Sequence, residues 1–342
     1  KLLSEGGEYS AVLIDGDEEL KDFCRYAKTN LAGFNVTIPY KKDIIKYLDK
    51  IRGIAKKTQS VNTVKNENGL LVGYNTDIYG IERALKHNGV ELSGKSALIL
   101  GGGGAASAAA TALSKKAEIT IAVRDKEKAK KAFSNYNVIG LNEISGGYDL
   151  IINCTPCGMK GQEDTSAIEI TGKNYGFIYD MVYNPLKTKL IKQAENFGIK
   201  CSNGLTMLIF QAIKARRIWG DKIRITRRQT ENIENALKAQ VLRQRLDGKG
   251  IALCGFMGSG KTTVAQYMQK KYGIQYTDTD ALIEKRCGKK IKDIFKQCGE
   301  SGFREIESEV ICGLNSDEFN ILSLGGGSVL MPQNAEHIKR RY

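Results

Sequence analysis

The sequence predicts an α/β protein in which two parallel sheets each open with a strand followed by a glycine-rich loop. A glycine-rich loop follows an apolar run at 96–100, and a different glycine loop follows the apolar run at 251–254. Between them, strand-like runs alternate with helical segments, which is the pattern of a doubly wound sheet covered by helices on both faces. The first loop reads G-G-G-G-A-A and the second reads G-F-M-G-S-G-K-T, so two different nucleotide sites are expected.

Composition limits the partners of the chain. Its 342 residues are enough for two or three domains. The formal net charge is +14, and residues 214–249 hold 11 Lys/Arg against 4 Asp/Glu. Trp219 is the only aromatic residue in that segment. The charge therefore favours a solvated helical face, or attraction of anionic substrates, over nucleic-acid binding. The sequence leaves the oligomeric state open.

The eight cysteines are scattered, which is typical of a reducing compartment. Only Cys154 and Cys157 form a C-x-x-C, and they follow a strand instead of opening a helix, so we expect neither redox nor metal use there. The longest uncharged stretch, 96–114, is mostly Gly, Ala and Ser after its first strand, which does not suit a membrane span. We expect a soluble, cytoplasmic protein. The chain opens at Lys1, so we also expect an N-terminal piece to be missing.

Residues 1–84 are expected to form the first domain. Their predicted elements are a strand at 10–14, a helix at 17–28, a strand and turn at 33–39, and a hairpin that joins 60–65 to 70–74. The helix is predicted because Leu20, Phe23, Cys24 and Ala27 share one face. The hairpin is predicted because Asn68-Gly69 favours a tight turn between two apolar runs.

Residues 85–204 are expected to form a Rossmann-type domain with strands at 96–100, 118–123, 149–153 and 176–180. Residues 205–246 are expected to form two helices that end in a linker. Residues 247–342 are expected to form the second α/β domain, with the sequence strand, loop, helix at its start.

The first glycine loop has the chemistry of a dinucleotide site. Gly101 permits the tight turn, Gly103 lets the backbone approach a pyrophosphate, and Ala106 packs the helix against the strand. The pyrophosphate would lie on the helix N-terminus, which begins near Gly104.

The end of the next strand bears on the choice of cofactor. An acid at this point would hydrogen-bond a ribose 2′-OH, whereas an arginine accommodates a 2′-phosphate. Here the strand ends at Arg124, and Lys128 follows closely. Asp125 lies between them and complicates the assignment. The pattern favours NADP over NAD.

Five motifs occur in order across residues 33–211. They are G-F-N-V-T-I-P-Y-K at 33–41, V-N-T at 61–63, G-Y-N-T-D at 73–77, D-M-V-Y-N-P at 180–185 and N-G-L-T-M-L-I-F-Q at 203–211. Together they resemble the shikimate dehydrogenase family. The resemblance implies NADPH-dependent reduction of 3-dehydroshikimate to shikimate, with residues 1–84 as the substrate-binding and catalytic domain.

The resemblance also implies roles for individual residues. It makes Lys41 and Asp77 the catalytic pair. The residue chemistry agrees, because reduction of a ketone leaves an alkoxide that needs a proton, and the chain has only two histidines. An exposed lysine after a proline is the alternative for Lys41, since Lys42 follows it. The remaining implied contacts are Thr37, Asn62, Tyr183 and Gln211 to shikimate, and Gly101, Gly103, Gly104, Ala105, Arg124, Lys128, Thr155, Met181 and Gly204 to NADP(H). The family's serine motif for the substrate carboxylate has no match at the start of the chain, so we expect the chain to begin after it.

The second glycine loop matches the P-loop G-x-x-x-x-G-K-[ST] at every position. Its backbone amides would hold the phosphates of ATP, Lys261 would reach the β- and γ-phosphates, and Thr262 would ligate Mg2+. The expected ATP-binding set is Gly258, Ser259, Gly260, Lys261, Thr262 and Thr263.

Three later segments carry further polar and glycine residues: D-T-D at 278–280, G-E-S-G-F-R-E at 299–305 and L-G-G-G-S at 324–328. With the P-loop they resemble the shikimate kinase family. The alternative is that 278–280 and 324–328 are ordinary turns and that Arg304 is a solvated charge on a helix. The resemblance implies that Asp278 lies near Mg2+ and that shikimate is held by Asp280, Arg304, Gly325, Gly326 and Gly327. The family's lid arginine and a later substrate-binding arginine have no counterpart before Tyr342. We therefore expect a missing C-terminal piece, and we expect the chain to bind nucleotide but to phosphorylate shikimate slowly or not at all.

The sequence therefore predicts two consecutive enzymes, a shikimate dehydrogenase followed by a shikimate kinase. The ketone reduced at the first site becomes the hydroxyl that is phosphorylated at the second. Two alternatives stay open at this stage. One is a dehydrogenase of quinate or a related cyclitol with a vestigial nucleotide-binding domain, and the other is a non-catalytic, regulatory binder of NADP and nucleotide.

Overall fold

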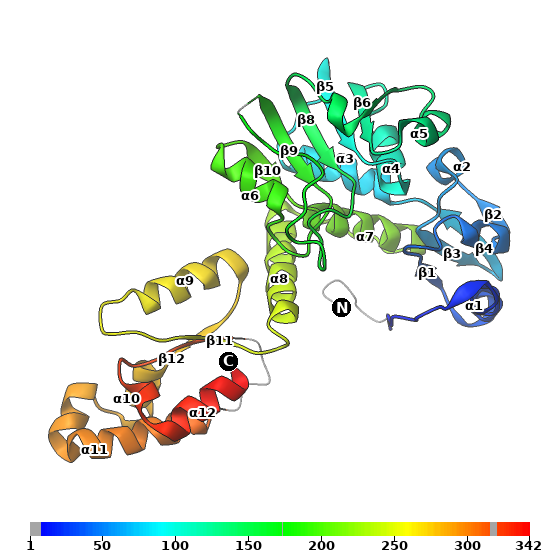
Figure 1. Ribbon diagram of the computed structural model, residues 1–342. Helices are drawn as coiled ribbons and strands as arrows, with labels where there is room; N and C mark the ends of the chain where they lie inside the picture. The colour runs from blue at the N-terminus through cyan, green and yellow to red at the C-terminus, as the bar shows by residue number, and fades with distance from the viewer. Residues whose placement is uncertain (1–7, 173, 315–319) are drawn as a thin grey trace. The chain divides into compact units, whose positions relative to one another are not determined.

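The structure is a computed structural model that describes residues 8–172, 174–314 and 320–342 (Figure 1). The chain divides into two compact units, Lys1–Thr230 and Glu231–Tyr342. The division falls inside helix α8 (Arg227–Arg245), which begins in the first unit and ends in the second. The finer domain bounds inferred from the sequence remain predictions.

The first sheet contains four strands in the order β1-β3-β4-β2. They are β1 (Gly33–Asn35), β2 (Lys50–Ile51), β3 (Thr63–Glu67) and β4 (Leu70–Tyr74), and β3 runs antiparallel to both of its neighbours. The predicted hairpin is confirmed. Its turn residues Asn68 and Gly69 have φ values of 55° and 87°, as a tight two-residue turn requires.

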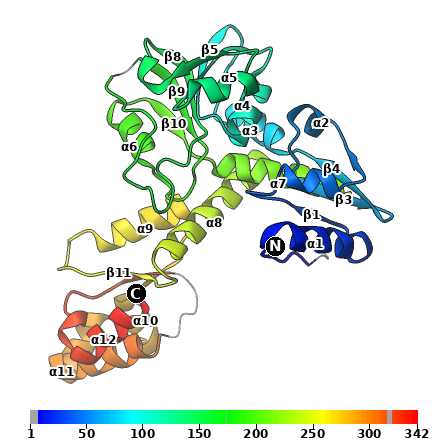
Figure 2. The same ribbon diagram turned by 45° about the vertical axis from the view of Figure 1, so that its right-hand side comes forward.

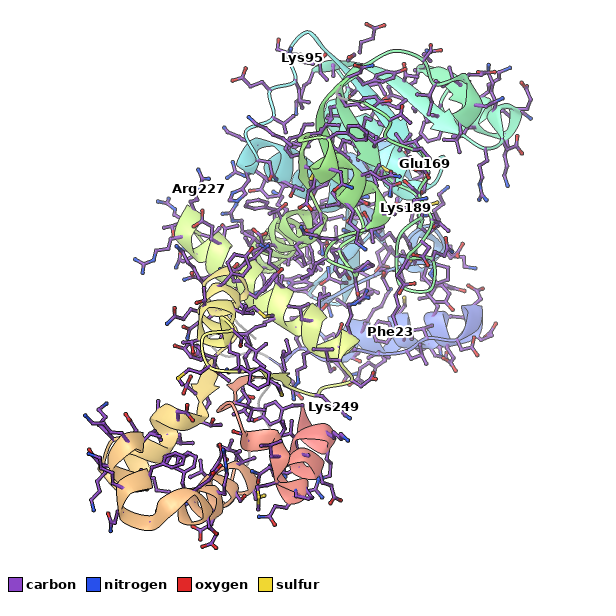
Figure 3. All side chains as sticks on the ribbon, turned by 60° about the vertical axis from the view of Figure 1, so that its left-hand side comes forward. Phe23, Lys95, Glu169, Lys189, Arg227 and Lys249 are labelled. Carbon is purple, nitrogen blue, oxygen red and sulfur yellow. The ribbon has the colours of Figure 1, made fainter. Side chains whose placement is uncertain are left out.

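Helix α1 (Gly16–Asn30) covers this sheet, and its predicted apolar face is confirmed. Leu20, Cys24 and Ala27 are buried, and the ring of Phe23 packs edge-on against Phe34 with 5.0 Å between centroids (Figure 3). The short helix η1 (Asp43–Tyr47) packs against α1, and the short helix α2 (Ile54–Thr58) contacts β4 and α4 (Gly104–Leu113).

The strand predicted at 10–14 is wrong. These residues form no strand, and the side chain of Leu13 is 92% exposed. An alternating apolar pattern stabilises a strand only where a neighbouring strand supplies hydrogen bonds. In the described part of the chain, residues 10–14 have no such neighbour. They lie instead along one side of a cleft, as shown below.

The second sheet is parallel throughout, in the order β10-β9-β8-β5-β6-β7. The four predicted strands are confirmed as β5 (Lys95–Leu100), β6 (Ala117–Val123), β8 (Tyr148–Asn153) and β9 (Tyr175–Asp180). The pattern missed β7 (Asn137–Gly140) and β10 (Lys200–Ser202), which are short edge strands. The strand order reverses between β5 and β8, and ligands of open α/β sheets bind at such a point.

Helices α4 (Gly104–Leu113), α5 (Lys126–Ala132) and α6 (Lys189–Asn196) connect the strands of this sheet. Lys189 at the start of α6 forms an exposed ion pair with Glu169 at 2.7 Å (Figure 3), and a pair this exposed adds little to stability. Helices α3 (Asp77–His87) and α7 (Leu205–Trp219) pack together, and α7 runs from the second sheet toward the first (Figures 1 and 2). The start of α3 and the middle of α7 thereby reach one site.

The second unit has a parallel sheet in the order β11-β13-β12. Its strands are β11 (Ile251–Leu253), β12 (Tyr276–Asp278) and β13 (Ile321–Ser323). Its helices after α8 are α9 (Lys261–Tyr272), α10 (Thr279–Cys287), α11 (Ile291–Cys312), η3 (Ser328–Leu330) and α12 (Pro332–Arg341). Helix α11 is kinked at Gly299, where φ is 69°. The predicted order of strand, P-loop and helix is confirmed. Among the described residues of the whole chain, no helix has the length and apolar character needed to cross a membrane.

Candidate active sites

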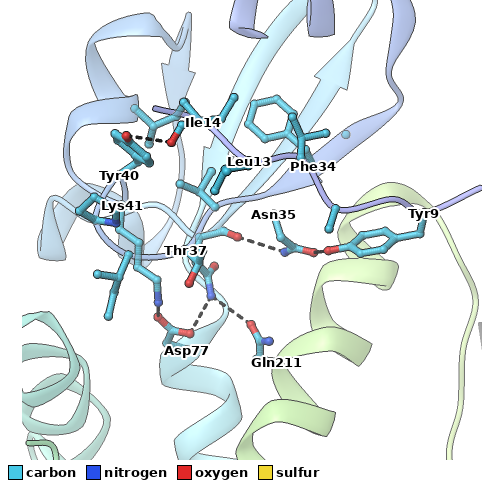
Figure 4. Close-up of a pocket in the computed structure, with 18 of the residues that line it drawn as sticks. Tyr9, Leu13, Ile14, Phe34, Asn35, Thr37, Tyr40, Lys41, Asp77 and Gln211 are labelled. Carbon is cyan, nitrogen blue, oxygen red and sulfur yellow. Dashed lines mark hydrogen bonds and ion pairs between the residues drawn. The ribbon is translucent and has the colours of Figure 1, made fainter. Parts of the chain in front are cut away.

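The first site is centred on an ion pair between Lys41 and Asp77 (Figure 4). Lys41 lies in the turn after β1, and Asp77 is the first residue of α3. Lys41 Nζ lies 2.7 Å from Asp77 Oδ2, and the two side chains are 28% and 13% exposed. The helix N-terminus favours the charged carboxylate, and the lysine neutralises it. The two residues assigned to catalysis from separate motifs are therefore in direct contact.

Asn62 occupies the other oxygen of the same carboxylate. Its Nδ2 donates to Asp77 Oδ1 at 2.7 Å and also lies 3.2 Å from Gln211 Oε1. Asn62 is only 3% exposed, so its amide has little water to compete for these contacts. Both oxygens of Asp77 thus have donors from this unit, which fixes the carboxylate relative to Lys41.

A cleft of about 900 Å3 opens beside this pair. All six residues assigned to catalysis and shikimate binding line it, and so do three of those assigned to the cofactor. They are Thr37, Lys41, Asn62, Asp77, Tyr183 and Gln211, with Ala105, Met181 and Gly204. The cleft therefore brings residues from the first sheet, the glycine loop and the start of α7 to one space. Gly101, Gly103, Gly104, Arg124, Lys128 and Thr155 do not line it.

The cleft also contains residues to which the sequence gave no role. Asn35 Nδ2 donates to the Asn62 carbonyl at 3.0 Å, and its Oδ1 accepts from the Tyr9 hydroxyl at 3.0 Å (Figure 4). Asn35 belongs to the same motif as Thr37 and Lys41, so its polar side chain in a strand was the available signal. Leu13 comes from the segment 10–14 in which a strand was expected, and Tyr9 directly precedes that segment; no motif marked either residue.

The glycine loop after β5 suits a dinucleotide. Gly101 has a φ of 111°, and a Cβ there would lie 3.1 Å from the Thr155 side chain, so only glycine fits easily. A Cβ on Gly103 or Gly104 would meet no described heavy atom within 4 Å, which leaves the start of α4 open to a phosphate. The loop and Thr155 lie at the ends of β5 and β8, on the two sides of the point where strand order reverses.

The structure accounts for Asp125, which had complicated the cofactor assignment. Its carboxylate accepts a hydrogen bond from the backbone of Lys128 at 3.0 Å and caps helix α5. Arg124 and Lys128 are exposed, and within the described ranges neither has an ion-pair partner. The Asp125 carboxylate is therefore engaged in capping the helix, and the cationic side chains of Arg124 and Lys128 are left to bind a 2′-phosphate.

We expect Arg124→Ala to weaken NADP binding by about 10–150-fold and to leave NAD binding nearly unchanged, because a charge-assisted hydrogen bond to the 2′-phosphate would be lost. Fluorescence titration of each cofactor measures the two dissociation constants. Lys131→Ala, an exposed lysine at the end of the same short helix, is the matched control. An equal loss for NAD and NADP would contradict the assignment.

The C-x-x-C motif shows no sign of redox chemistry. Burial, with a smaller contribution from the charge of Asp180, raises the pKa of the Cys154 thiol, so little thiolate is present at neutral pH. Among the residues that the structure describes, no group of three or more His, Cys, Asp or Glu could hold a metal ion.

The second site begins at the P-loop, between β11 and α9. Gly258 and Gly260 have positive φ values of 79° and 85°, which the loop needs to turn its amides inward. Lys261 Nζ donates to the carbonyls of Gly255 and Phe256, at 2.7 and 2.9 Å. The lysine side chain therefore folds back over its own loop. A bound phosphate would replace these two carbonyls as the hydrogen-bond acceptor of the ammonium group. Ser259 and Thr263 occupy the same loop and the first turn of α9.

A pair of oxygen donors lies beside the P-loop. The hydroxyl of Thr262 is 3.4 Å from Asp278 Oδ2, at the end of β12. A hydroxyl and a carboxylate are hard oxygen ligands of the kind that Mg2+ prefers in nucleotide sites. The donor set therefore fits the predicted metal, which would bind these two residues together with nucleotide phosphates.

The residues assigned to shikimate in this unit converge around the glycines after β13. A Cβ on Gly325 would lie 2.7 Å from Asp280 Oδ1, and a Cβ on Gly327 would clash with the guanidinium of Arg304. A Cβ on Gly326 would lie 3.7 Å from the backbone nitrogen of Met257, in the P-loop. A Cβ on Gly325 or Gly327 would force the Asp280 or Arg304 side chain to move, whereas one on Gly326 would make only ordinary contact. The triple glycine, the acid and the arginine therefore lie close together, next to the P-loop.

Sequence reasoning missed Glu307, which holds this site together. Its side chain is fully buried and accepts from Arg304 Nη1 at 2.8 Å and from the Ser328 hydroxyl at 2.6 Å. Glu307 follows Arg304 by three residues on α11, and this helical spacing was the available signal. Burial is the main cause that raises the pKa of Asp280, followed by the negative charges of Asp278 and Glu307.

We expect Asp280→Asn to raise the melting temperature of the second unit at neutral pH while it lowers phosphorylation of shikimate. The raised pKa means that the folded state holds the Asp280 proton more tightly than the unfolded state does. Ionised Asp280 therefore costs stability above its folded pKa, and this cost vanishes below the unfolded value of about 3.9.

Differential scanning fluorimetry between pH 4 and 8 measures the effect. The increase in melting temperature produced by Asp280→Asn should become smaller as the pH falls. Asp293→Asn, at an exposed position of α11, is the control and should show no such gain. A melting temperature of Asp280→Asn below that of the unchanged chain at pH 7.5 would contradict the prediction.

The fold and these sites define an α/β dehydrogenase of the Rossmann type joined to a P-loop kinase. Residues 2–64 match the shikimate dehydrogenase substrate binding domain, and residues 257–342 match shikimate kinase. Over 232 residues the chain is 39% identical to the shikimate dehydrogenase (NADP(+)) of Caldicellulosiruptor bescii, which covers 64% of this chain and 81% of that protein. The enzyme of the same name from Methanococcus maripaludis is 39% identical over 231 residues, 64% of this chain and 83% of that protein.

Solved structures give the same result for the dehydrogenase part of the chain. A chorismate mutase/shikimate 5-dehydrogenase fusion protein from Clostridium acetobutylicum aligns with a TM-score of 0.59 and 33% identity, over 66% of this chain and 84% of that one. Shikimate 5-dehydrogenase from Thermus thermophilus, in complex with NADP(H) and shikimate, aligns with a TM-score of 0.58 and 29% identity, over 64% and 84%. The chain belongs to the shikimate dehydrogenase family, and its C-terminal part is a domain of the shikimate kinase family.

Proposed function

We propose that this chain performs two consecutive steps on one ring. Its first unit reduces 3-dehydroshikimate to shikimate with NADPH, and its second unit phosphorylates shikimate with ATP and Mg2+. The observation that carries the first step is the Lys41–Asp77 ion pair in a cleft that also contains Ala105, Met181 and Gly204. This arrangement supports a proton-transfer pair placed between a substrate pocket and a dinucleotide loop.

In the first unit, bound NADPH would supply the hydride. Lys41 donates a proton to the oxygen that becomes the hydroxyl of shikimate, and it takes that proton back in the reverse direction. Asp77 holds the lysine ammonium in position, and Asn62 holds Asp77. Thr37, Tyr183 and Gln211 line the same cleft with groups that can hydrogen-bond a polyhydroxylated ring.

In the second unit, bound ATP would supply the phosphoryl group. The P-loop amides, Lys261 and the Mg2+ ligands Thr262 and Asp278 hold the phosphates. Asp280 accepts the proton of the shikimate hydroxyl, and its raised pKa suits a proton acceptor better than an ordinary aspartate would. Arg304, kept in place by Glu307, forms a bidentate pair with the substrate carboxylate.

The test is a pair of assays on the purified chain. Reduction of NADP+ is followed at the nicotinamide band with shikimate and, separately, with quinate. Release of ADP is followed with shikimate and Mg-ATP. Shikimate-dependent activity in both assays supports the proposal. A preference for quinate in the first assay would favour the cyclitol dehydrogenase alternative. No activity in either assay would favour a non-catalytic binder.

The proposal extends to the setting of the enzyme. We place it in the cytoplasm, because scattered free cysteines suit a reducing compartment. Its proposed partners are small-molecule substrates, without nucleic acid or membrane.

A further inference from the structure

Thr76 lies at the N-cap of helix α3 but does not cap it. A threonine at this position usually accepts a hydrogen bond from the first turn of the helix. Here the Thr76 side chain makes no such bond, and the Asp77 backbone nitrogen donates instead to Asn75 Oδ1 at 3.0 Å. The hydroxyl of Thr76 is fully buried and available for another contact.

That contact is with the polar side chains around the catalytic pair. Thr76 Oγ1 accepts from Asn62 Nδ2 at 3.0 Å and lies 3.3 Å from Gln211 Oε1. It also lies 3.2 Å from Asn62 Oδ1 and 3.3 Å from the hydroxyl of Thr63. One buried hydroxyl thereby joins β3, the start of α3 and the middle of α7.

Counting donors and acceptors shows where the Thr76 proton goes. Asn62 Oδ1 already accepts from the Thr76 backbone nitrogen at 2.8 Å and from the Thr63 hydroxyl at 3.1 Å, which occupies both of its lone pairs. Two acceptors remain for the single Thr76 proton, Gln211 Oε1 and the Thr63 hydroxyl oxygen, both at 3.3 Å. The Thr63 oxygen already accepts from Asn35 Nδ2 at 3.1 Å, which favours Gln211 Oε1. Asn62 Nδ2 gives one proton to Asp77 Oδ1 at 2.7 Å. Its other proton is shared between Thr76 Oγ1 at 3.0 Å and Gln211 Oε1 at 3.2 Å.

The orientation of the Gln211 amide follows from this. Its oxygen is held inward by two donors, so its nitrogen is the atom left for the cleft that Gln211 lines. Among the described residues, Gln211 Nε2 has no hydrogen-bond partner, and Figure 4 shows it turned away from Asp77. A glutamine fixed in this way offers a donor, and so selects an acceptor oxygen on the ligand.

We propose that Thr76 is a positioning residue that fixes the Gln211 amide with its nitrogen toward the ligand, so that the site recognises an acceptor oxygen of a hydroxylated ring. This inference rests on the proposed function of the first unit. Thr76 touches neither substrate nor cofactor in it, and its whole effect passes through Gln211.

The test is a double-mutant cycle of Thr76→Val and Gln211→Ala, measured as shikimate oxidation at saturating NADP+. Valine keeps the branched shape of Thr76 and removes only the hydroxyl. We expect Thr76→Val to raise the KM for shikimate about 5–15-fold, with kcat within about threefold. In the Gln211→Ala background the same change should add less than about twofold, because its target is already gone.

Two further variants separate positioning from general destabilisation. Thr76→Ser keeps the hydroxyl and should restore a KM within about twofold of the unchanged chain. Thr206→Val removes a buried hydroxyl that has no partner in the described structure, from the same helix as Gln211, and should leave the KM unchanged. If Thr76→Val does not fold, Thr76→Ala replaces it in the cycle.

Effects that add in the double variant, or that fall on kcat instead of KM, would overturn the inference, since they would indicate action through Asn62 and Asp77. If the unsubstituted chain binds shikimate by calorimetry but does not oxidise it, the proposed function alone is wrong. The double-mutant cycle would then be measured with the dissociation constants for shikimate in place of KM. A chain that neither binds nor oxidises shikimate would overturn both.

Discussion

Replacing Lys41 by methionine should lower kcat for shikimate oxidation by about 10²–10⁴-fold, the usual contribution of a general acid–base group. Methionine keeps most of the aliphatic stem and removes the ammonium that lies 2.7 Å from Asp77. Since Lys41 is not among the residues around the glycine loop, the dissociation constant for NADP should not change. Stopped-flow absorbance for turnover and fluorescence titration for cofactor binding measure the two quantities.

Lys42 is a close control, because it is the next residue in the same turn and is exposed. Lys42→Met should keep near-normal turnover. This comparison also addresses the plain alternative that Lys41 is only a surface lysine after a proline. Near-normal turnover of Lys41→Met, or an equal loss in both variants, would remove Lys41 from the mechanism.

The loss in Lys41→Met has a second expected consequence. Asp77 would keep its bond to Asn62 but lose its counter-ion at a position that is only 13% exposed. A partly buried carboxylate without its cation costs stability, which the helix N-terminus offsets only in part. A modest fall in the melting temperature should therefore accompany the loss of turnover, and circular dichroism should still report a folded chain.

Sequence patterns predicted the parts of the fold that depend on local signals. The long strands β5, β6, β8 and β9 are apolar runs, and the Asn68-Gly69 turn has the backbone that its residues favour. The short strands β7 and β10 carry too few residues for a period to be visible. The segment at 10–14 has the composition of a strand, but pairing depends on what lies beside it, which composition does not encode.

The site residues divide in the same way. Lys41, Asp77 and Gln211 were named because each lies in a recognisable motif. The Lys41–Asp77 and Asn62–Gln211 contacts, however, depend on how α3 and α7 pack against the first sheet. Glu307 lies only three residues beyond Arg304, and nothing local distinguishes a buried acid from a solvated one. Thr76 looks like a helix cap in the sequence. Its different use became visible only when its hydroxyl partners came from β3 and α7.

The second large effect is expected at Lys261. Lys261→Met should lower the rate of shikimate-dependent ADP release by about 10²–10³-fold, the cost of removing one well-placed donor from a developing charge. In the structure the Lys261 ammonium is held 2.7 Å from the Gly255 carbonyl, within the loop that would surround the phosphates. Phosphoryl transfer depends on positioning and charge stabilisation, so the loss should appear in kcat.

The control is Lys270→Met, which changes an exposed lysine near the other end of the same helix and should have no effect. NADP-dependent oxidation of shikimate, measured on the same protein samples, should be unchanged in both variants, because Lys261 and Lys270 lie in the second compact unit and the dehydrogenase cleft lies wholly in the first. An Lys261→Met variant that still releases ADP at the rate of the unchanged chain would show that phosphate binding does not pass through this lysine. The P-loop would then be a nucleotide-binding element without the catalytic role that its sequence predicts.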